Sequence, residues 1–247
     1  MHQSGDNGSV IWSLPPEIPW PQFLRLLRNP APPVGWLEAA ADLAELKHRP
    51  MLMRWIAQHP KAPAALRNRL LPALPWRALA AIAGDASAHP QARSHATERL
   101  QARWSVLSTG ERRSFAPMAP RQLWGAIWKV RDTGVLAAFL QNPRLQPETL
   151  EALLQPPLTN FQAEALQDSR WQKVVPIAQA VLLALDQTLD RPDSGLVLGL
   201  AATWILALSP EECLVTASRL TGPALRRMVR GRAARELPEP DPNRFDV

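Results

Sequence analysis

The chain has 247 residues, a length that fits one or two domains. Hydrophobic residues make up 46% of it and charged residues 20%, which excludes a mainly disordered or collagen-like protein. Its 26 Pro outnumber its 11 Gly, and neither glycine-rich phosphate-binding motif, G-x-G-x-x-G or G-x-x-x-x-G-K-[ST], occurs. The single cysteine, Cys213, excludes a disulfide within the chain. We therefore expect a folded protein without a nucleotide-binding loop.

The first residues and the longest uncharged stretch bear on location. Residues 1–10 are polar and lack the apolar run of a secretory signal, which predicts a cytoplasmic protein. Ser194–Pro210 is shorter than the roughly 20 apolar residues that a membrane-spanning helix needs. We interpret it as a buried helix. Membrane insertion is the alternative, because Gly195 and Gly199 have the G-x-x-x-G spacing of helix pairs in membranes.

Apolar residues recur at helical spacing along most of the chain, while strand-type alternation is nearly absent. Leu and Ala, which favour helices, dominate these segments. Three stripes show the pattern in chain order: Met51, Leu52, Trp55 and Ile56; then Leu123, Trp124, Ile127 and Trp128; then Val135, Leu136, Phe139 and Leu140. The prediction is an all-α protein without a β-sheet.

A proline motif punctuates these stripes at Asn29–Pro33, His59–Pro63 and Asn142–Pro147. We expect its first residue to close one helix in the left-handed conformation, and the proline after it to prevent continuation. The last proline of the motif would then begin the next helix, where its missing N–H is not needed. His59 stands where the other two copies have Asn, so we interpret it as a cap residue.

Capping boxes mark further helix starts, at Ser108 with Glu111, Thr159 with Gln162, and Ser209 with Glu212. Other expected helices lie near residues 91–107, 108–116 and 121–130, within a total of about ten to fifteen helices of about 8 to 16 residues. A pair of short helices cannot bury both of its faces alone. The pairs are therefore expected to stack into an α-solenoid.

The run from Ala57 to Leu154 resembles a group of bacterial helical-repeat proteins. The resemblance lies in the segments His59–Pro63, Leu70–Leu79, Gly110–Arg113 and Leu140–Leu145. These proteins are related to the leucine-rich-repeat-variant and HEAT-like, armadillo-type repeats. The resemblance implies a solenoid of short helix pairs and no particular reaction.

We divide the chain into four parts. Residues 19–187 are expected to form the helical-repeat domain. A polar loop then precedes a C-terminal helical subdomain, residues 188–236, which is expected to cap the stack. Residues 1–18 and the acidic, Pro-rich residues 237–247 are expected to be disordered tails.

The sequence offers no recognisable catalytic or metal-binding constellation. None of the five histidines belongs to an H-E-x-x-H motif, and the G-x-S-x-G motif of serine hydrolases is missing. Cys213 follows a capping box, and we interpret it as a packed apolar residue rather than a reactive thiol. No enzyme activity, metal or cofactor is expected. The alternative is an enzyme whose site is assembled across helices.

Charge is distributed unevenly along the chain. Residues 47–131 hold 15 basic and three acidic side chains, a net charge of +12, whereas residues 132–212 carry −6. A positive surface attracts phosphates or acidic partners. The alternative is that the arginines are solvated or paired locally. The candidate contacts in this region are Arg67, Arg69, Arg77 and Arg121.

Two further groups are candidate partner contacts. On a helix at residues 223–236, the apolar face of Leu225, Met228, Val229 and Ala233 would dock on the stack. Arg226, Arg227 and Arg230 would project from the opposite face, where the acidic tail could mask them. Trp124 and Trp128 lie four residues apart and are interpreted as core residues, with a partner-binding groove as the alternative.

The expected function is a noncatalytic helical-repeat scaffold or adaptor that binds another macromolecule, most simply a protein. The alternative is a nucleic-acid-binding protein that uses residues 47–131 or the Arg-rich C-terminal helix. A membrane partner is not expected.

Overall fold

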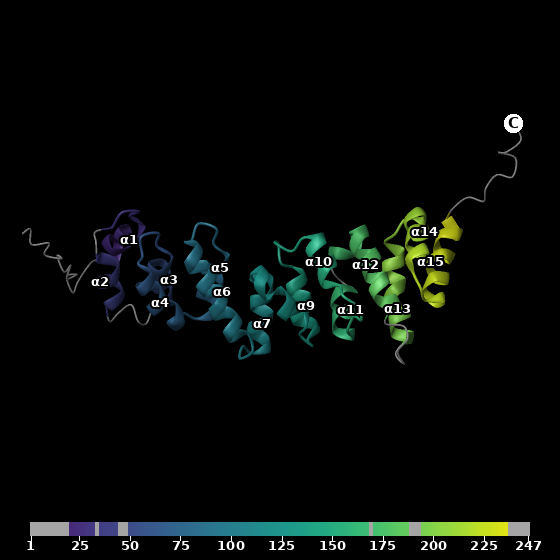
Figure 1. Cartoon of the computed structure of the whole chain (residues 1–247), viewed down its shortest axis with the longest axis horizontal. Coiled ribbons are helices and arrows are strands. Elements are labelled where there is room, and N and C mark those ends of the chain that lie inside the picture. Colours follow the sequence, from purple (N-terminus) through teal and green to yellow (C-terminus); the bar gives the residue numbers. More distant parts are fainter. Residues whose placement is uncertain (1–19, 33–34, 44–48, 168–169, 188–193, 237–247) are drawn as a thin grey trace, which may run out of the picture. The chain divides into compact units, whose positions relative to one another are not determined.

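The computed structural model describes residues 20–32, 35–43, 49–167, 170–187 and 194–236. All regular elements in these residues are helical, and fifteen of them are α-helices (Figure 1). The all-α prediction is therefore confirmed. The expected tails at residues 1–18 and 237–247, including the masking of arginines by the second, lie outside the described residues.

The described chain forms two compact units, which we call unit 1 (residues 1–107 and 120–122) and unit 2 (residues 108–119 and 123–247). The helices of unit 1 are α1 (Trp20–Arg28), α2 (Trp36–Asp42), α3 (Pro50–Gln58), α4 (Ala64–Leu70), η2 (Leu71–Ala73), α5 (Trp76–Gly84) and α6 (Pro90–Trp104). Within this unit, α3 packs against α2, α4 and α5, and α6 packs against α5 and η2.

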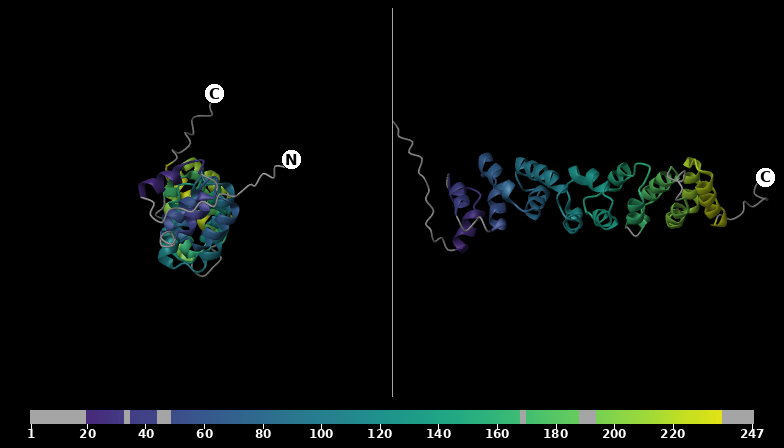
Figure 2. Two further views of the ribbon diagram at one scale, coloured as in Figure 1. Left: turned by 90° about the vertical axis from the view of Figure 1, so that its left-hand side faces the viewer. Right: turned by 90° about the horizontal axis from the view of Figure 1, so that it is seen from below.

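Unit 2 contains α7 (Thr109–Phe115), η3 (Ala116–Met118), α8 (Trp124–Trp128), α9 (Thr133–Leu140), α10 (Pro147–Leu153), α11 (Asn160–Gln167), η5 (Arg170–Lys173), α12 (Val175–Asp186), α13 (Ser194–Leu206), α14 (Pro210–Arg219) and α15 (Pro223–Glu236). The 3₁₀ turn η4 (Arg121–Leu123) precedes α8. One row of neighbours consists of α7, α9, α11, α13 and α15, each packed against the next. On another side α10 packs against α12, and Figure 2 shows the same helices from two further directions.

The boundary expected at residue 188 does not coincide with the division between the two units. Helix α13 packs against α11 and α12, which precede that boundary, as well as against α15. Helix α15 buries Leu225, Val229 and Ala233 completely, as its apolar stripe predicts. The C-terminal helices therefore belong to the same compact unit as α9 to α12.

Helix ends follow the predicted positions with a different geometry. The left-handed conformation predicted for the cap residues is wrong, because among the described residues only Gly35 has a positive φ. His59 is extended, with φ −58° and ψ 131°. Its Nδ1 instead accepts the N–H of Lys61 at 3.1 Å, and the Asn29 and Asn142 side chains accept the N–H two residues on at 3.0 Å. This side-chain turn reverses the chain without a left-handed residue.

Prolines and capping boxes account for most of the remaining helix boundaries. Pro147 is the first residue of α10 as predicted, whereas Pro63 lies one position earlier, as the N-cap of α4. All three capping boxes are present. The predicted minimum length of about eight residues is too long, since α4 and α7 have seven residues. A proline two residues after each, Pro72 and Pro117, converts the following turn to a 3₁₀ helix.

Two predicted helical stripes differ in detail from the structure. Leu52 and Ile56 are buried on α3, but Met51 is exposed and Trp55 is half-buried. The helix expected at residues 121–130 is shorter, because Leu123 belongs to η4 and α8 has only five residues. Its four apolar side chains are nevertheless all buried, as are those of the stripe on α9.

Three polar links join a helix-end carbonyl to a side chain about 30 residues later in the chain. In unit 1, His59 Nε2 donates to the Asn29 carbonyl oxygen at 2.9 Å, across 30 residues. In unit 2, Gln162 donates to the Trp128 carbonyl at 2.7 Å and Trp171 to the Leu140 carbonyl at 3.0 Å, across 34 and 31 residues. These bonds satisfy helix-end carbonyls that have no partner within their own helix.

Candidate binding surfaces

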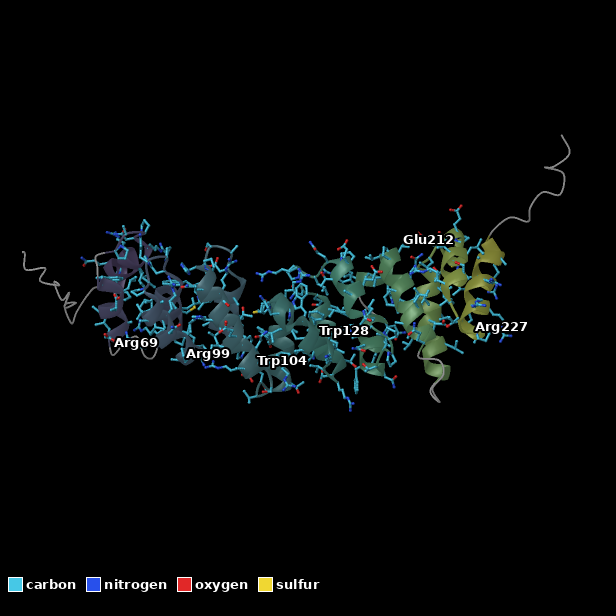
Figure 3. All side chains as sticks on the ribbon, viewed as in Figure 1. Arg69, Arg99, Trp104, Trp128, Glu212 and Arg227 are labelled. Carbon is cyan, nitrogen blue, oxygen red and sulfur yellow. The ribbon has the colours of Figure 1, made fainter. Side chains whose placement is uncertain are left out.

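The two tryptophans singled out in the sequence lie in the core of unit 2. Trp124 and Trp128 are 5% and 4% exposed, and both rings contact Phe139, with centroids 6.1 and 6.3 Å apart. The Trp124 indole N–H donates to the Ala119 carbonyl at 2.9 Å. Figure 3 shows Trp128 among the helices of this unit. The core interpretation is confirmed, and the groove alternative is wrong for these rings because almost none of their surface is accessible.

Two of the candidate arginines serve helix ends instead of an open surface. Arg67 is 4% exposed, and its guanidinium donates to the Pro60 carbonyl at 3.4 Å. Burial lowers the pKa of Arg67. Arg226 is half-buried, and its Nε donates to the carbonyl of Leu220, the C-cap of α14, at 2.9 Å. Their selection as partner contacts is corrected, because both side chains are occupied by carbonyls left open at the ends of helices.

The other candidates in the basic region are exposed but have separate local contacts. Arg69 on α4 forms an ion pair with Asp42 at 2.9 Å. Arg77 lies over the Trp76 ring, 5.2 Å from its centroid. Arg121 is exposed on η4. Each belongs to a different element, so the sequence cluster becomes several separate charges.

Arg227 and Arg230 lie on the exposed side of α15, opposite its buried Leu225 and Val229. The Arg227 Nε donates to the Pro223 carbonyl at 3.3 Å, within its own helix, and Figure 3 shows this side chain pointing away from the neighbouring helices. Neither arginine forms an ion pair with a described residue. Of the candidate arginines, these two are exposed together on one side of a helix, as the sequence predicted.

Two structural arginines escaped the sequence analysis. Arg103 on α6 donates to the carbonyls of Pro72 and Leu74, around η2. Arg170 donates to the Asn142 carbonyl at 2.9 Å and covers the Trp171 ring. Each arginine lies about 30 residues after the carbonyls that accept its hydrogen bonds, a spacing that could have identified both. Part of the positive charge therefore stabilises the fold rather than forming a binding surface.

A groove of about 250 Å³ lies on α12, between residues of α10 and α14. The three helices succeed one another in unit 2 (Figure 1). Helix α10 packs against α12, and Asp186 at the end of α12 accepts hydrogen bonds from Thr221, just after α14. The groove is lined by Glu151, Leu154, Gln155, Pro156, Pro176, Gln179, Ala180, Leu183, Ala184, Gln187 and Arg219. We call it the α12 groove.

The α12 groove has an apolar floor and polar sides. Ala180, Leu183 and Ala184 follow one another at helical spacing on its floor. The opposite side of α12 is apolar as well, with Ala178, Leu182 and Leu185 buried in the core. A helix that is apolar on both sides is normally covered on both. The outer side of α12 is covered only in part by the described chain.

Of the polar side chains around the α12 groove, Gln155 donates to the Ala152 carbonyl at 3.1 Å, and four others have no partner among the described residues. Within the described chain, the side chains of Gln179, Gln187, Glu151 and Arg219 have no hydrogen-bond or ion-pair partner. Each amide offers both donors and an acceptor. The groove therefore combines apolar surface with unused hydrogen-bonding groups, the usual composition of a binding site.

Exposed apolar residues extend this surface along α14. Leu214 and Val215 are 48% and 56% exposed. Val215 is one helical turn before Arg219, so the two share a side of the helix. The stripes identified in the sequence did not include α12, so the groove was not predicted.

A second cavity, of about 470 Å³, lies in unit 1 and is lined by Leu27, Arg28, Trp55, Gln58, His59, Pro60, Asp85, Ser87 and Ala88. Its polar groups are largely paired with one another. Gln58 donates to Asp85 at 2.9 Å, and the Ser87 hydroxyl donates to the same carboxylate at 2.6 Å. These bonds from Ser87 lower the pKa of Asp85. This cavity is an internal network at the ends of α3 and α5.

The structure also places the cysteine and the side chains that could bind a metal. Cys213 is completely buried, which confirms its packed position. In the part of the chain that the structure describes, no three His, Cys, Asp or Glu side chains are grouped to hold a metal ion. The same residues contain no helix with the length and apolar character required to cross a bilayer.

No protein-family model, curated protein or solved structure matches the chain.

Proposed function

We propose that this chain is a noncatalytic α-solenoid scaffold that binds another protein through the α12 groove. The observation that carries the proposal is the groove itself, an apolar floor on α12 with unpaired polar side chains from three helices. A protein partner would cover the outer side of α12 and give the free amides hydrogen-bond partners. Both changes favour association.

Two features of the helices support the solenoid. Within unit 2, each helix of the row from α7 to α15 packs against the next, as stacked repeats require. Several polar links in both units span about one repeat, for example 30 residues for His59 and Asn29 and 34 for Gln162 and Trp128. Contacts of this range are typical of a structure in which each repeat touches its neighbours.

The test uses the same substitution at two positions. Ala180 lies on the floor of the α12 groove, whereas Ala152 is exposed on α10 and outside its lining. Ala180→Arg would fill the groove, and Ala152→Arg is the matched control. Proteins retained from the native lysate by the wild-type chain are expected to be retained by Ala152→Arg and lost from Ala180→Arg. Equal retention by both variants would contradict the proposal, provided that circular dichroism shows both to be folded.

The exposed arginines of α15 support nucleic acid as a second candidate partner. Arg227 and Arg230 have no ion-pair partner among the described residues. If they bind phosphates, the logarithm of affinity falls linearly with the logarithm of salt concentration, with a slope of about −0.9 for each contact on duplex DNA. A mobility-shift titration across salt, with the double variant Arg227→Glu and Arg230→Glu, measures this. Binding that is equal for wild type and variant would rule out the α15 surface.

A further inference from the structure

We infer that the α12 groove takes an extended peptide segment with a basic side chain toward α10 and a carboxylate toward α14. This inference rests on the proposed function and names the class of partner for the same site. Its basis is the placement of Glu151, Gln179, Gln187 and Arg219 around one apolar floor.

The size and the free amides favour an extended segment. A helix is about 10 Å across with its side chains and has its backbone hydrogen bonds satisfied internally. An extended segment exposes unpaired N–H and C=O groups, which the amides of Gln179 and Gln187 can accept from and donate to. The cavity of about 250 Å³ is small enough to be filled by a few side chains of such a segment.

The two charged side chains give the groove a direction. Glu151 comes from α10 on one flank of α12, and Arg219 comes from α14 on the other. Neither has an ion-pair partner in the described chain. A peptide that placed a basic side chain at Glu151 and a carboxylate at Arg219 would pair both. The reversed peptide would place like charges together, which is costly at an interface.

The apolar floor sets what lies between the two charges. Ala180 and Leu183 are half-buried, and the small side chain of Ala180 leaves room above the helix, whereas Ala184, one turn further on, is buried. One or two apolar side chains of the peptide would fill this space. The inferred sequence pattern is therefore a basic residue and an acidic residue separated by a short apolar segment.

The experiment selects peptides from a phage-displayed library of random 12-residue sequences on the full-length chain. A counter-selection step on the Ala180→Arg variant, whose groove is filled, removes peptides that bind outside the groove. Affinities of the enriched peptides are then measured by fluorescence anisotropy against the wild type, Arg219→Glu and Glu151→Arg. Both substituted residues are exposed, so the fold should be retained.

We expect enriched peptides with the inferred pattern and binding about tenfold weaker to Arg219→Glu. A peptide whose acidic residue is changed to lysine should bind Arg219→Glu better than it binds the wild type. This rescue separates a direct contact from general damage to the groove.

Two results would overturn the inference. Groove-dependent peptides without charged residues, or with no loss on Arg219→Glu, would leave the proposed function standing and refute the charge pattern. Absence of any peptide sensitive to Ala180→Arg would refute the extended-peptide class. The lysate comparison with Ala152→Arg then decides the proposed function separately.

Discussion

Two cavities of this protein, one in each unit, differ in how their polar side chains are used. In unit 1, Gln58 and Ser87 both donate to Asp85, and His59 uses both ring nitrogens within the fold. In unit 2, the side chains of Gln179, Gln187 and Arg219 line the α12 groove without partners among the described residues. Paired polar groups stabilise helix ends, whereas unpaired ones beside an apolar floor are available to another molecule.

His59→Ala should produce the largest effect of the changes considered. His59 is 5% exposed, and its loss would leave the Asn29 carbonyl and the Lys61 N–H without these partners and also create a cavity. We expect a loss of about 2–4 kcal/mol in the free energy of unfolding. Gln179→Ala in the α12 groove should cost less than about 0.5 kcal/mol. Urea denaturation measures both losses in unfolding free energy. Similar losses for the two variants would contradict the difference between the two cavities.

Two glycines of unit 2 extend the comparison to the backbone. Gly222 donates to the buried Asp186 carboxylate at 3.0 Å, and a Cβ at this position would overlap that carboxylate. Gly222→Ala is expected to destabilise the protein by about 1–3 kcal/mol. Gly231 on α15 has open space around it, so Gly231→Ala should stabilise by up to about 1 kcal/mol. Thermal denaturation gives the melting temperatures of both variants, and shifts in the same direction would contradict the expected difference between Gly222 and Gly231.

Two arginines test whether charge serves the fold or a surface. Arg103→Ala removes two hydrogen bonds to the carbonyls of Pro72 and Leu74 and should cost about 1–2 kcal/mol. Arg219→Ala removes no bond within the described chain and should stay within about 0.5 kcal/mol. Chemical denaturation of the two variants gives the difference. A larger loss for Arg219→Ala would mean that the groove side chain is structural.

The smallest effect concerns acid stability of unit 1. The Ser87 hydroxyl and N–H hold the pKa of Asp85 below its ordinary value of 3.8. The folded state therefore favours the carboxylate, and this contribution is present above about pH 4 and disappears as pH falls through the folded pKa. Melting temperatures between pH 7 and pH 3 should fall less steeply for Asp85→Asn than for the wild type. If melting temperature falls with pH equally in both proteins, the Asp85 carboxylate does not contribute to the pH dependence of stability.

Local sequence signals predicted the helices better than the use of their side chains. The capping box of Ser108 and the stripe of Val135 and Leu136 follow from short-range spacing alone, and both are confirmed. Arg67 carries the same charge as Arg227, yet one is buried and the other exposed. Which arginine meets a helix-end carbonyl depends on packing between helices that are far apart in the sequence. Net charge along the sequence therefore overstated the basic surface.

The α12 groove was hidden from the sequence for a related reason. Ala180 and Leu183 have the same apolar character as Leu182 and Leu185, which are buried on the opposite side of the same helix. Only the placement of α10 and α14 decides which side of α12 is left open. An apolar pattern on both sides of a helix was the available signal, because such a helix is normally covered on both sides and the described residues cover the outer side of α12 only in part.

We propose that the partner protein occupies the α12 groove. Hydrogen exchange of the full-length chain, followed by mass spectrometry with and without the protein that it retains from the lysate, tests this proposal. We expect slower exchange on binding in residues 147–155, 175–187 and 210–222. Protection confined to unit 1 or to α15, with these segments unchanged, would contradict it.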